Sequence, residues 1–540
     1  MNLLILVLIA LVAFAIALKT YGGYLGKLVG LDNSKKTPAH TMTDGVDYIP
    51  TKVPVLMGHH FSSIAGAGPI TGPIAASVFG WLPCFLWIVL GSIFIGGVHD
   101  FMALISSVRN EGKSIGEVVG KNVSTRAKTL FLIFICLTLI LIIAVFAILT
   151  ANTFAADSSA ASASVLMMAI AVAMGFGLYR RGMPLSTVTI VGVILLAVAI
   201  WIGIAAPFLT FSSKTWICIL LVYMFLASVL PVWTLLQPRD YLSSFLLYAA
   251  LGGGFIGILF GAPKLQLAAY TSFHQPIGYL FPILFVTIAC GAISGFHSLV
   301  ASGTTSKQLN KESDAKVIGY GSMLLEGVLA IIALGTAAML TREGLAEGLT
   351  SWGGPVGVFS HGMGSFLANL GIPEKIGTTF GALAVSTFLL TTLDTATRLT
   401  RYALQELTVE WAPTLSNKYV ATIISVVLGG ILALTGTWSA IWPIFGSANQ
   451  LLAGLTLLGV SAWLAHMGKK YTMTLYPMVF MIIVTVVALI TMVFQNFAKA
   501  NYLLGFVSII LLILAGFVIN EGIQAISKFK TLKTNLKEAK

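Results

Sequence analysis

Apolar runs of about twenty residues recur along the entire chain, separated by short polar turns. A run of this length matches an α-helix that crosses the hydrocarbon core of a bilayer. Of the 540 residues, 57% are hydrophobic and only 9% are charged, whereas a soluble domain carries about 25% charged residues. We therefore expect an all-α polytopic membrane protein with about 15 transmembrane helices and no soluble domain.

The expected spans are 1–18, 54–79, 82–108, 129–151, 160–180, 186–207, 215–236, 244–261, 279–306, 316–340, 376–393, 417–436, 440–464, 474–495 and 501–525. They form a single membrane domain over 1–540. It consists of a first helix and cytoplasmic loop (1–50), a core (51–465), and C-terminal helices with a basic tail (466–540). Between the spans, residues 341–375 are expected to be an outer loop made of turns, because they include Trp352-Gly353-Gly354-Pro355.

The net charge of +12 comes mainly from Lys and Arg in alternate loops between the spans. The positive-inside rule explains this pattern better than nucleic-acid binding does. It places the N-terminus outside and the C-terminus in the cytoplasm of a bacterial or archaeal plasma membrane. The four cysteines all lie inside apolar segments, so we expect no disulfide framework.

The stretch from Thr51 to Gly80 interrupts the pattern of uniform spans. It contains two adjacent histidines and a cluster of helix breakers, namely His59, His60, Gly66, Gly68, Pro69, Gly72 and Pro73. Proline removes a backbone donor and glycine weakens a helix interior, so we expect a broken helix here. At membrane depth such breaks line a cavity, and in transporters they lie at the substrate site. The alternative is a re-entrant loop or a kinked structural helix.

A downstream segment has weak sequence similarity to this stretch. The segment His60–Gly68 places His, Ser and small residues in mid-span, and the segment Gly295–Gly303 does the same. In the expected topology the two segments run in opposite directions, as an inverted repeat requires. The short match alone is also compatible with the general abundance of Gly and Ser in membrane helices.

Ionisable residues within spans are costly and mark functional hypotheses. Glu326 lies in mid-span, where it either couples transport to an ion or bonds a neighbouring helix. Asp100 adjoins His99 nearer the end of its span. A histidine beside a carboxylate suits proton relay, and the alternative is an interfacial pair.

Two further groups of charges lie near the inner ends of helices. Asp394 and Arg398 are spaced i, i+4 and are expected to pair on one helix face, as a structural contact or a gate. Arg239, beside Asp240, is either a bidentate clamp for a carboxylate or a topology anchor. The amide pair Asn449-Gln450 opens another span, where it either bonds substrate or joins helices.

The sequence argues against several other classes of protein. Adjacent histidines on a helix point about 100° apart, so they rarely share one ion, and no H-E-x-x-H motif occurs. We expect no metal site, no cofactor and no enzymatic activity. No Walker-type phosphate loop is present, so an ion gradient is the expected energy source.

Several blocks of the sequence resemble the carbon-starvation protein CstA family of membrane transporters. The residues that carry the resemblance are Asp44–Pro73, Gly96–Phe101, Pro231–Leu242, Cys290–Leu309, Thr391–Tyr402 and Phe445–Leu455. The resemblance implies uptake of peptides, or of pyruvate in some relatives, driven by protons during nutrient limitation. It also implies kinship with the amino acid–polyamine–organocation superfamily, whose leucine-transporter-like core is a five-plus-five inverted repeat with broken first and sixth helices. The span count equally allows a seven-plus-seven division.

The combined hypothesis is alternating access around a site at the two broken helices. Its substrate-binding residues would be His59, His60, Ser63, Gly66, Gly68, Ser294, His297, Ser298 and Ser302. Ion coupling would use Glu326, Asp100, His99 and Asp394, and gating would use Arg239, Asp240 and Arg398. The partners would be a peptide or pyruvate, protons with Na⁺ as the alternative, and lipid. A nutrient sensor and a channel are the rival functions.

Overall fold

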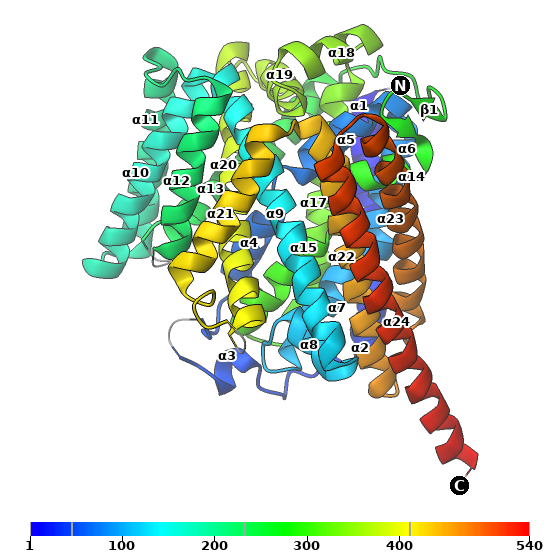
Figure 1. Cartoon of the computed structure of the whole chain (residues 1–540). Helices are drawn as coiled ribbons and strands as arrows, with labels where there is room; N and C mark the ends of the chain where they lie inside the picture. Colours follow the sequence, from blue (N-terminus) through cyan, green and yellow to red (C-terminus); the bar gives the residue numbers. More distant parts are fainter. Residues whose placement is uncertain (1, 45–46, 231–233, 410–411, 539–540) are drawn as a thin grey trace.

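The structure is a computed structural model that describes all residues except 1, 45–46, 231–233, 410–411 and 539–540. Long helices run side by side between two ends of one bundle (Figure 1). Within the described residues, 12 segments are long and apolar enough to cross a membrane. The first begins at one end of the bundle, and the last leaves it at the other (Figure 1).

The candidate spans contain α1 (Leu3–Lys19) with α2 (Tyr21–Val29), α6 (Trp81–Gly91) with α7 (Gly97–Val108), α9 (Thr125–Ala156), α10 (Ser158–Arg180), α11 (Leu185–Ala205), α13 (Leu236–Gly261), α17 (Ser322–Ala338), α20 (Glu374–Thr408), α21 (Lys418–Thr435), α22 (Trp438–His466), α23 (Thr472–Ala498) and α24 (Tyr502–Glu538). A π-helical turn, Ser92–Gly96, joins α6 to α7, and another, Lys316–Gly321, precedes α17. The apolar helix α12 (Ser213–Val229) is slightly shorter.

The remaining elements are short. They are α3 (Pro38–Thr41), α4 (Val53–Ile64), α5 (Gly68–Ala76), a 3₁₀ turn (Ser77–Phe79), α8 (Ile115–Asn122), a hairpin of β1 (His274–Gln275) and β2 (Gly278–Tyr279), α14 (Leu280–Thr287), α15 (Gly295–Val300), a π-helical turn (Ala301–Thr305), α16 (Ser306–Gln308), α18 (Arg342–Ser351) and α19 (Pro355–Ala368). The expected break in the first segment is confirmed, because α4 ends at Ile64 and α5 begins at Gly68. The downstream segment is broken as well, between α14 and α15.

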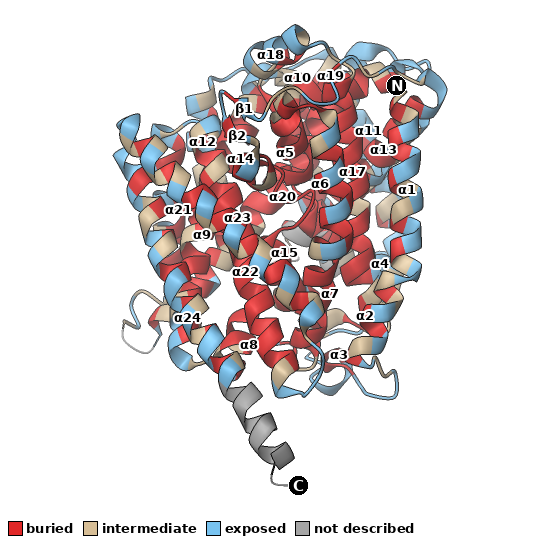
Figure 2. Ribbon diagram, turned by 90° about the vertical axis from the view of Figure 1, so that its right-hand side faces the viewer, coloured by how far each residue is buried: buried red, intermediate tan, exposed pale blue. Residues whose placement is uncertain are grey.

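The interior and the perimeter of the bundle differ in burial (Figure 2). In the most apolar 18-residue segment of α22, 94% of the residues are buried, whereas in that of α11 only 28% are buried. Large apolar side chains such as Trp201 and Phe494 project outward from peripheral helices. An apolar perimeter suits contact with lipid, because lipid tails are as apolar as these side chains.

Three expectations about the elements were wrong in detail. Residues 341–375 contain two helices, α18 and α19, instead of turns alone, and α19 packs against α20 with an apolar face that is too short to register as a span. The span expected at 376–393 continues to Thr408, because polar residues in its C-terminal part, such as Asp394 and Thr397, are buried in the protein. The first loop begins at Gly30 instead of Lys19, because α2 continues the first helix.

Candidate functional site

The two broken helices lie against each other at the centre of the chain. A Cβ atom at Gly68 would collide with Cys290, and one at Gly72 would lie 3.1 Å from the Cα of Ile288. Helix α5 contacts α14, and α4 contacts α15. Glycine is therefore required at both positions for this close approach. The structure brings together the two segments that the sequence predicted to form the substrate site.

A buried chain of histidines and carboxylates borders the second break. Ring N–H groups of His99 and His297, both at Nδ1, donate to Asp100 at 2.7 Å and 2.8 Å. On its other side, His297 Nε2 lies 3.2 Å from Glu326 Oε2. All four side chains have no exposed surface. Helices α7, α15 and α17 thus contribute one continuous titratable chain, which joins residues that the sequence had assigned to separate roles.

His60 faces this chain from the first broken helix. Its Nδ1 lies 2.8 Å from Thr305 Oγ1, and its electrostatic neighbours include Asp100 and His297. The partly buried His59 has Asp240 as its electrostatic neighbour instead. The two adjacent histidines therefore face different surroundings, as their angular separation on a helix predicts.

The predicted serines are engaged within the protein. Ser63 donates to the His59 carbonyl at 2.7 Å, and Ser302 donates to the Ser298 carbonyl at 2.6 Å. Ser298 donates to the Gly295 carbonyl at 2.7 Å. Because these hydroxyls are already bonded to backbone, their direct contribution to a ligand would be as acceptors.

Asn449 joins α22 to the second break, a contact that the sequence could not assign. Its Oδ1 accepts from the backbone N–H of Phe296 at 2.9 Å, and its Nδ2 donates to Ser294 Oγ at 3.0 Å. Helix α22 thereby caps the start of α15. The backbone N–H of Phe296 is therefore already bonded and is not free to bind the carboxylate of a substrate.

A second buried network lies on the other side of α4. Arg239 pairs with Asp394 and donates to Asp240 at 2.8 Å. The Tyr223 hydroxyl lies 2.5 Å from Arg239 Nη1 and donates to Asp394 at 2.8 Å. Arg239 has no exposed surface, so the network joins α12, α13 and α20 in the interior.

The predicted pairing of Asp394 with Arg398 is wrong. Arg398 donates to the carbonyls of Ala227 at 2.7 Å and Leu230 at 2.9 Å. Asp394 pairs with Arg239, which is 155 positions away in the sequence. The i, i+4 spacing allowed Asp394 to pair with Arg398, but Asp394 pairs instead with the buried guanidinium of Arg239 on α13.

An ion pair at the end of the bundle where α7 ends was also missed by the sequence reasoning. Arg109 donates to Glu312 through Nε at 3.0 Å and Nη2 at 2.8 Å, and its Nη1 donates to the Val29 carbonyl at 2.8 Å. Nearby, Thr51 N donates to the Gln308 carbonyl at 3.0 Å. These contacts tie the chain before the first broken helix to the chain after the second.

Within the described residues, no group of three or more His, Cys, Asp or Glu side chains is arranged to hold a metal ion. Asp100 instead accepts hydrogen bonds from His99 and His297, and Glu326 lies next to His297. The arrangement can hold and move protons in the interior of a helical bundle.

Comparisons with known proteins give a consistent result. The model of the family described as carbon starvation protein CstA matches residues 2–347 and 343–488. The peptide transporter CstA of Campylobacter jejuni is 34% identical, over 89% of this chain and 79% of the relative. The pyruvate/proton symporter BtsT of Escherichia coli is 33% identical, over 88% of this chain and 80% of the relative.

The fold is also found among solved structures. A manganese transporter of Eremococcus coleocola, solved in complex with an aromatic bis-isothiourea substituted compound, has a TM-score of 0.51 and 12% sequence identity. The match covers 90% of this chain and 99% of that one. At this identity the likeness concerns the fold alone.

Proposed function

Because the chain belongs to the carbon starvation protein CstA family, we propose that it takes up peptides by proton symport and alternating access. It is a multi-pass membrane protein, and its relatives are named as transporters. The second candidate substrate is pyruvate, because one relative is named as a pyruvate/proton symporter. Both candidates carry a carboxylate.

The observation that carries this proposal is the contact of two broken helices beside a buried, titratable chain. Irregular backbone at membrane depth is tolerated where it lines a cavity or is buried in protein. Transporters use such breaks to bind substrate. The breaks after Ile64 and after Thr287 meet next to His60 and His297, which supports a substrate site there.

The chain from Asp100 to Glu326 supports the coupling step. When His297 donates from Nδ1 to Asp100, the short gap between its Nε2 and Glu326 has room for one proton. That proton is held either by the ring, facing an ionised Glu326, or by Glu326, facing a neutral ring. A proton that enters with substrate would alternate between these two positions as the helices rearrange.

The gating roles of Arg239, Asp240 and Arg398 are part of the same proposal. A buried Arg–Asp pair holds α13 against α20, and Arg398 holds α20 against the end of α12. The ion pair of Arg109 and Glu312 ties together the approaches to both breaks. Separation of such contacts would accompany opening toward one side of the membrane.

The proposed architecture is a leucine-transporter-like core with an inverted repeat. Helices α4 and α5 on one side, and α14 and α15 on the other, would be the equivalent broken elements. If α12 and the two interrupted helices also cross, the 12 candidate spans increase to the expected number of about 15. An odd number of crossings agrees with the positions of the start of α1 and the end of α24, which lie at opposite ends of the bundle (Figure 1).

The test is uptake into proteoliposomes that hold the purified protein, under an imposed inward proton gradient. Labelled dialanine and labelled pyruvate are compared in parallel, and a Na⁺ gradient is applied separately. We expect accumulation of dialanine that a protonophore abolishes. Accumulation of pyruvate alone would establish the second candidate. Binding of either compound without accumulation would favour a sensor, and accumulation limited to equilibrium would favour a channel.

A further inference from the structure

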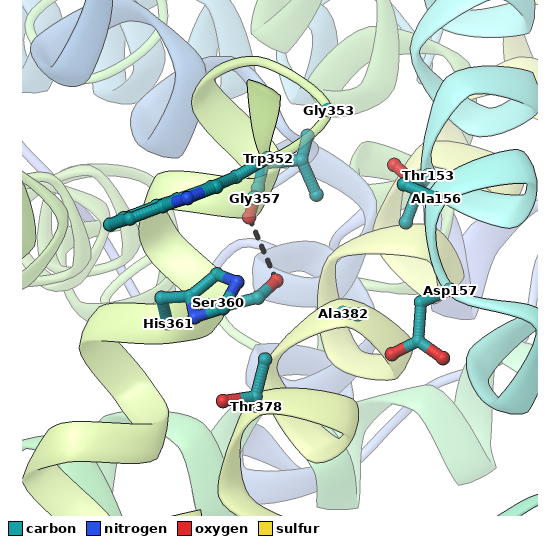
Figure 3. Close-up of a pocket in the computed structure, with 11 residues that line it drawn as sticks. Thr153, Ala156, Asp157, Trp352, Gly353, Gly357, Ser360, His361, Thr378 and Ala382 are labelled. Atoms are coloured by element: carbon teal, nitrogen blue, oxygen red, sulfur yellow. Dashed lines mark hydrogen bonds between the residues drawn. The ribbon is translucent and has the colours of Figure 1, made fainter. Parts of the chain in front are cut away.

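A pocket lies at the end of the bundle that holds α18 and α19, opposite to the ion pair of Arg109 and Glu312. Its volume is about 130 Å³. It is formed by the turn between α9 and α10, the link between α18 and α19, and the first turns of α20 (Figure 3). The family motifs identified in the sequence do not include these residues. A pocket of this size fits the end of a small molecule and excludes a folded partner.

The chemistry of the lining is that of a cation site. Asp157 supplies a carboxylate, and none of the 11 lining residues is Lys or Arg. Opposite Asp157, the Trp352 and His361 rings lie with centroids 4.4 Å apart (Figure 3). Tryptophan is the best aromatic partner for a cation. A pocket with a carboxylate on one wall and an aromatic side chain on another is therefore suited to an ammonium group.

Asp157 has capacity for a ligand beyond its structural role. Its Oδ1 accepts from the backbone N–H groups of Ser159 and Ala160, at 2.9 Å and 3.0 Å, and so caps α10. These bonds use one of its two carboxylate oxygens. An ionised carboxylate accepts about four hydrogen bonds, so an ammonium can bind while the cap stays in place.

The pocket is connected to the broken helices through two neighbouring helices. Thr153 of α9 and Ala382 of α20 line the pocket. Further along the same helices, Phe146 and Thr392 lie against Gly66 in the first break. At 1.5 Å per residue, the distance along the helices is about 10 to 15 Å. A ligand in the pocket would thus lie above the proposed substrate site.

We propose that this pocket is an outer recognition site for the α-ammonium group of a peptide, with Asp157 as counter-ion and Trp352 as the aromatic face. The inference rests on the proposed function and deepens it, because it separates the two candidate substrates. A peptide carries an ammonium group and pyruvate does not. The site would raise the capture of peptides without affecting pyruvate.

The test compares wild type with Asp157→Asn in the proteoliposome assay. Asparagine caps a helix as well as aspartate does, so the substitution removes the charge and keeps α10 in place. Labelled dialanine, N-acetyl-dialanine and pyruvate are the probes. We expect KM for dialanine to rise about tenfold, which is typical for loss of one well-placed ionic contact. The maximal rate and the uptake of pyruvate should stay the same.

The control is Glu343→Gln, which removes an exposed negative charge on α18 outside the pocket. It should leave all three KM values unchanged. A second variant, Trp352→Leu, should raise KM for dialanine and leave pyruvate uptake intact.

Three results would overturn the inference. They are an unchanged KM for dialanine in Asp157→Asn, an equal rise for N-acetyl-dialanine, and a wild type that carries pyruvate but no dialanine. In the first two cases the proposed peptide transport itself would stand. In the third, only the pyruvate alternative would remain.

Discussion

Two buried charge networks lie on either side of α4, and they differ in chemistry. On one side, Asp100 and Glu326 are connected through His297. On the other, Asp394 and Asp240 share Arg239. The neighbouring residues His60 and His59 face these networks respectively. The short helix α4 thus separates buried carboxylates that are paired with histidine from buried carboxylates that are paired with arginine.

The two networks differ in whether their basic side chain can change its charge near neutral pH. A guanidinium keeps its charge throughout the physiological range, so the Arg239 network holds a fixed positive charge. Histidine changes its charge near neutral pH, so the His297 network can gain and lose a proton. We infer that the Arg239 network holds helices together and propose that the His297 network carries the coupling proton.

The largest expected effect is on stability, in Asp394→Ala. The substitution leaves the fully buried guanidinium of Arg239 without its main partner. Loss of one member of a buried ion pair costs about 3–5 kcal/mol. We expect a strongly lowered unfolding temperature in detergent. The double variant Arg239→Met with Asp394→Leu should regain stability, because no charge is left unpaired. A single variant that is as stable as wild type would contradict the assignment of a structural role.

The next effect is functional, in Glu326→Gln. A glutamine keeps the shape of the side chain but cannot take a proton from His297. An imposed gradient of about two pH units permits up to about hundredfold accumulation, because each unit is equivalent to about 1.36 kcal/mol. We expect the variant to equilibrate substrate without accumulating it, at nearly normal stability. Glu347→Gln, an exposed site on α18, is the control. Uptake by Glu326→Gln that still follows the pH gradient would exclude Glu326 as the coupling residue.

A smaller effect should distinguish the two histidines of α4. His60 bonds Thr305 at 2.8 Å in a fully buried position, whereas His59 is partly buried. Loss of one partner of a buried hydrogen bond costs about 1–3 kcal/mol. We expect His60→Ala to raise the KM for substrate about tenfold and His59→Ala to change it less. Equal effects would show that the two sides of α4 contribute alike to transport.

The sequence predicted the features that depend on local chemistry. Long apolar runs identified the spans, and the Gly and Pro residues of 51–80 identified the first break. It also identified most of the buried ionisable residues, because such groups stand out in an apolar run. The pairing of Arg239 with Asp394 could not be predicted, since 155 positions separate them. The sequence favoured the local partner Arg398, and only the packing of α13 against α20 excludes it.

Other features depend on packing that no local pattern records. Arg109 and Glu312 are 203 positions apart, so the sequence could not predict their ion pair. The cap that Asn449 provides for α15 likewise joins segments from separate parts of the chain. Helix α19 has only 14 residues, which is too short for hydropathy to identify it as a membrane span. In a helical membrane protein, therefore, the sequence predicts which residues are unusual, and the fold decides which of them meet.

The smallest expected effect comes from an ion pair outside the buried networks, between Glu117 of α8 and Lys128. The two groups lie 2.5 Å apart, and the Glu117 side chain is 41% exposed. The hydrogen bond from Lys128 lowers the pKa of Glu117. A lowered pKa means that the stabilisation is present above the pKa of an unfolded glutamate, about 4.3, and is lost as pH falls through the folded value. Because solvent screens this pair, Glu117→Gln should cost about 0.5 kcal/mol at pH 7 and nothing in strong acid. Unfolding curves at both pH values measure this difference. A cost as large as that of Asp394→Ala would show that burial is not what separates the interior networks from the surface.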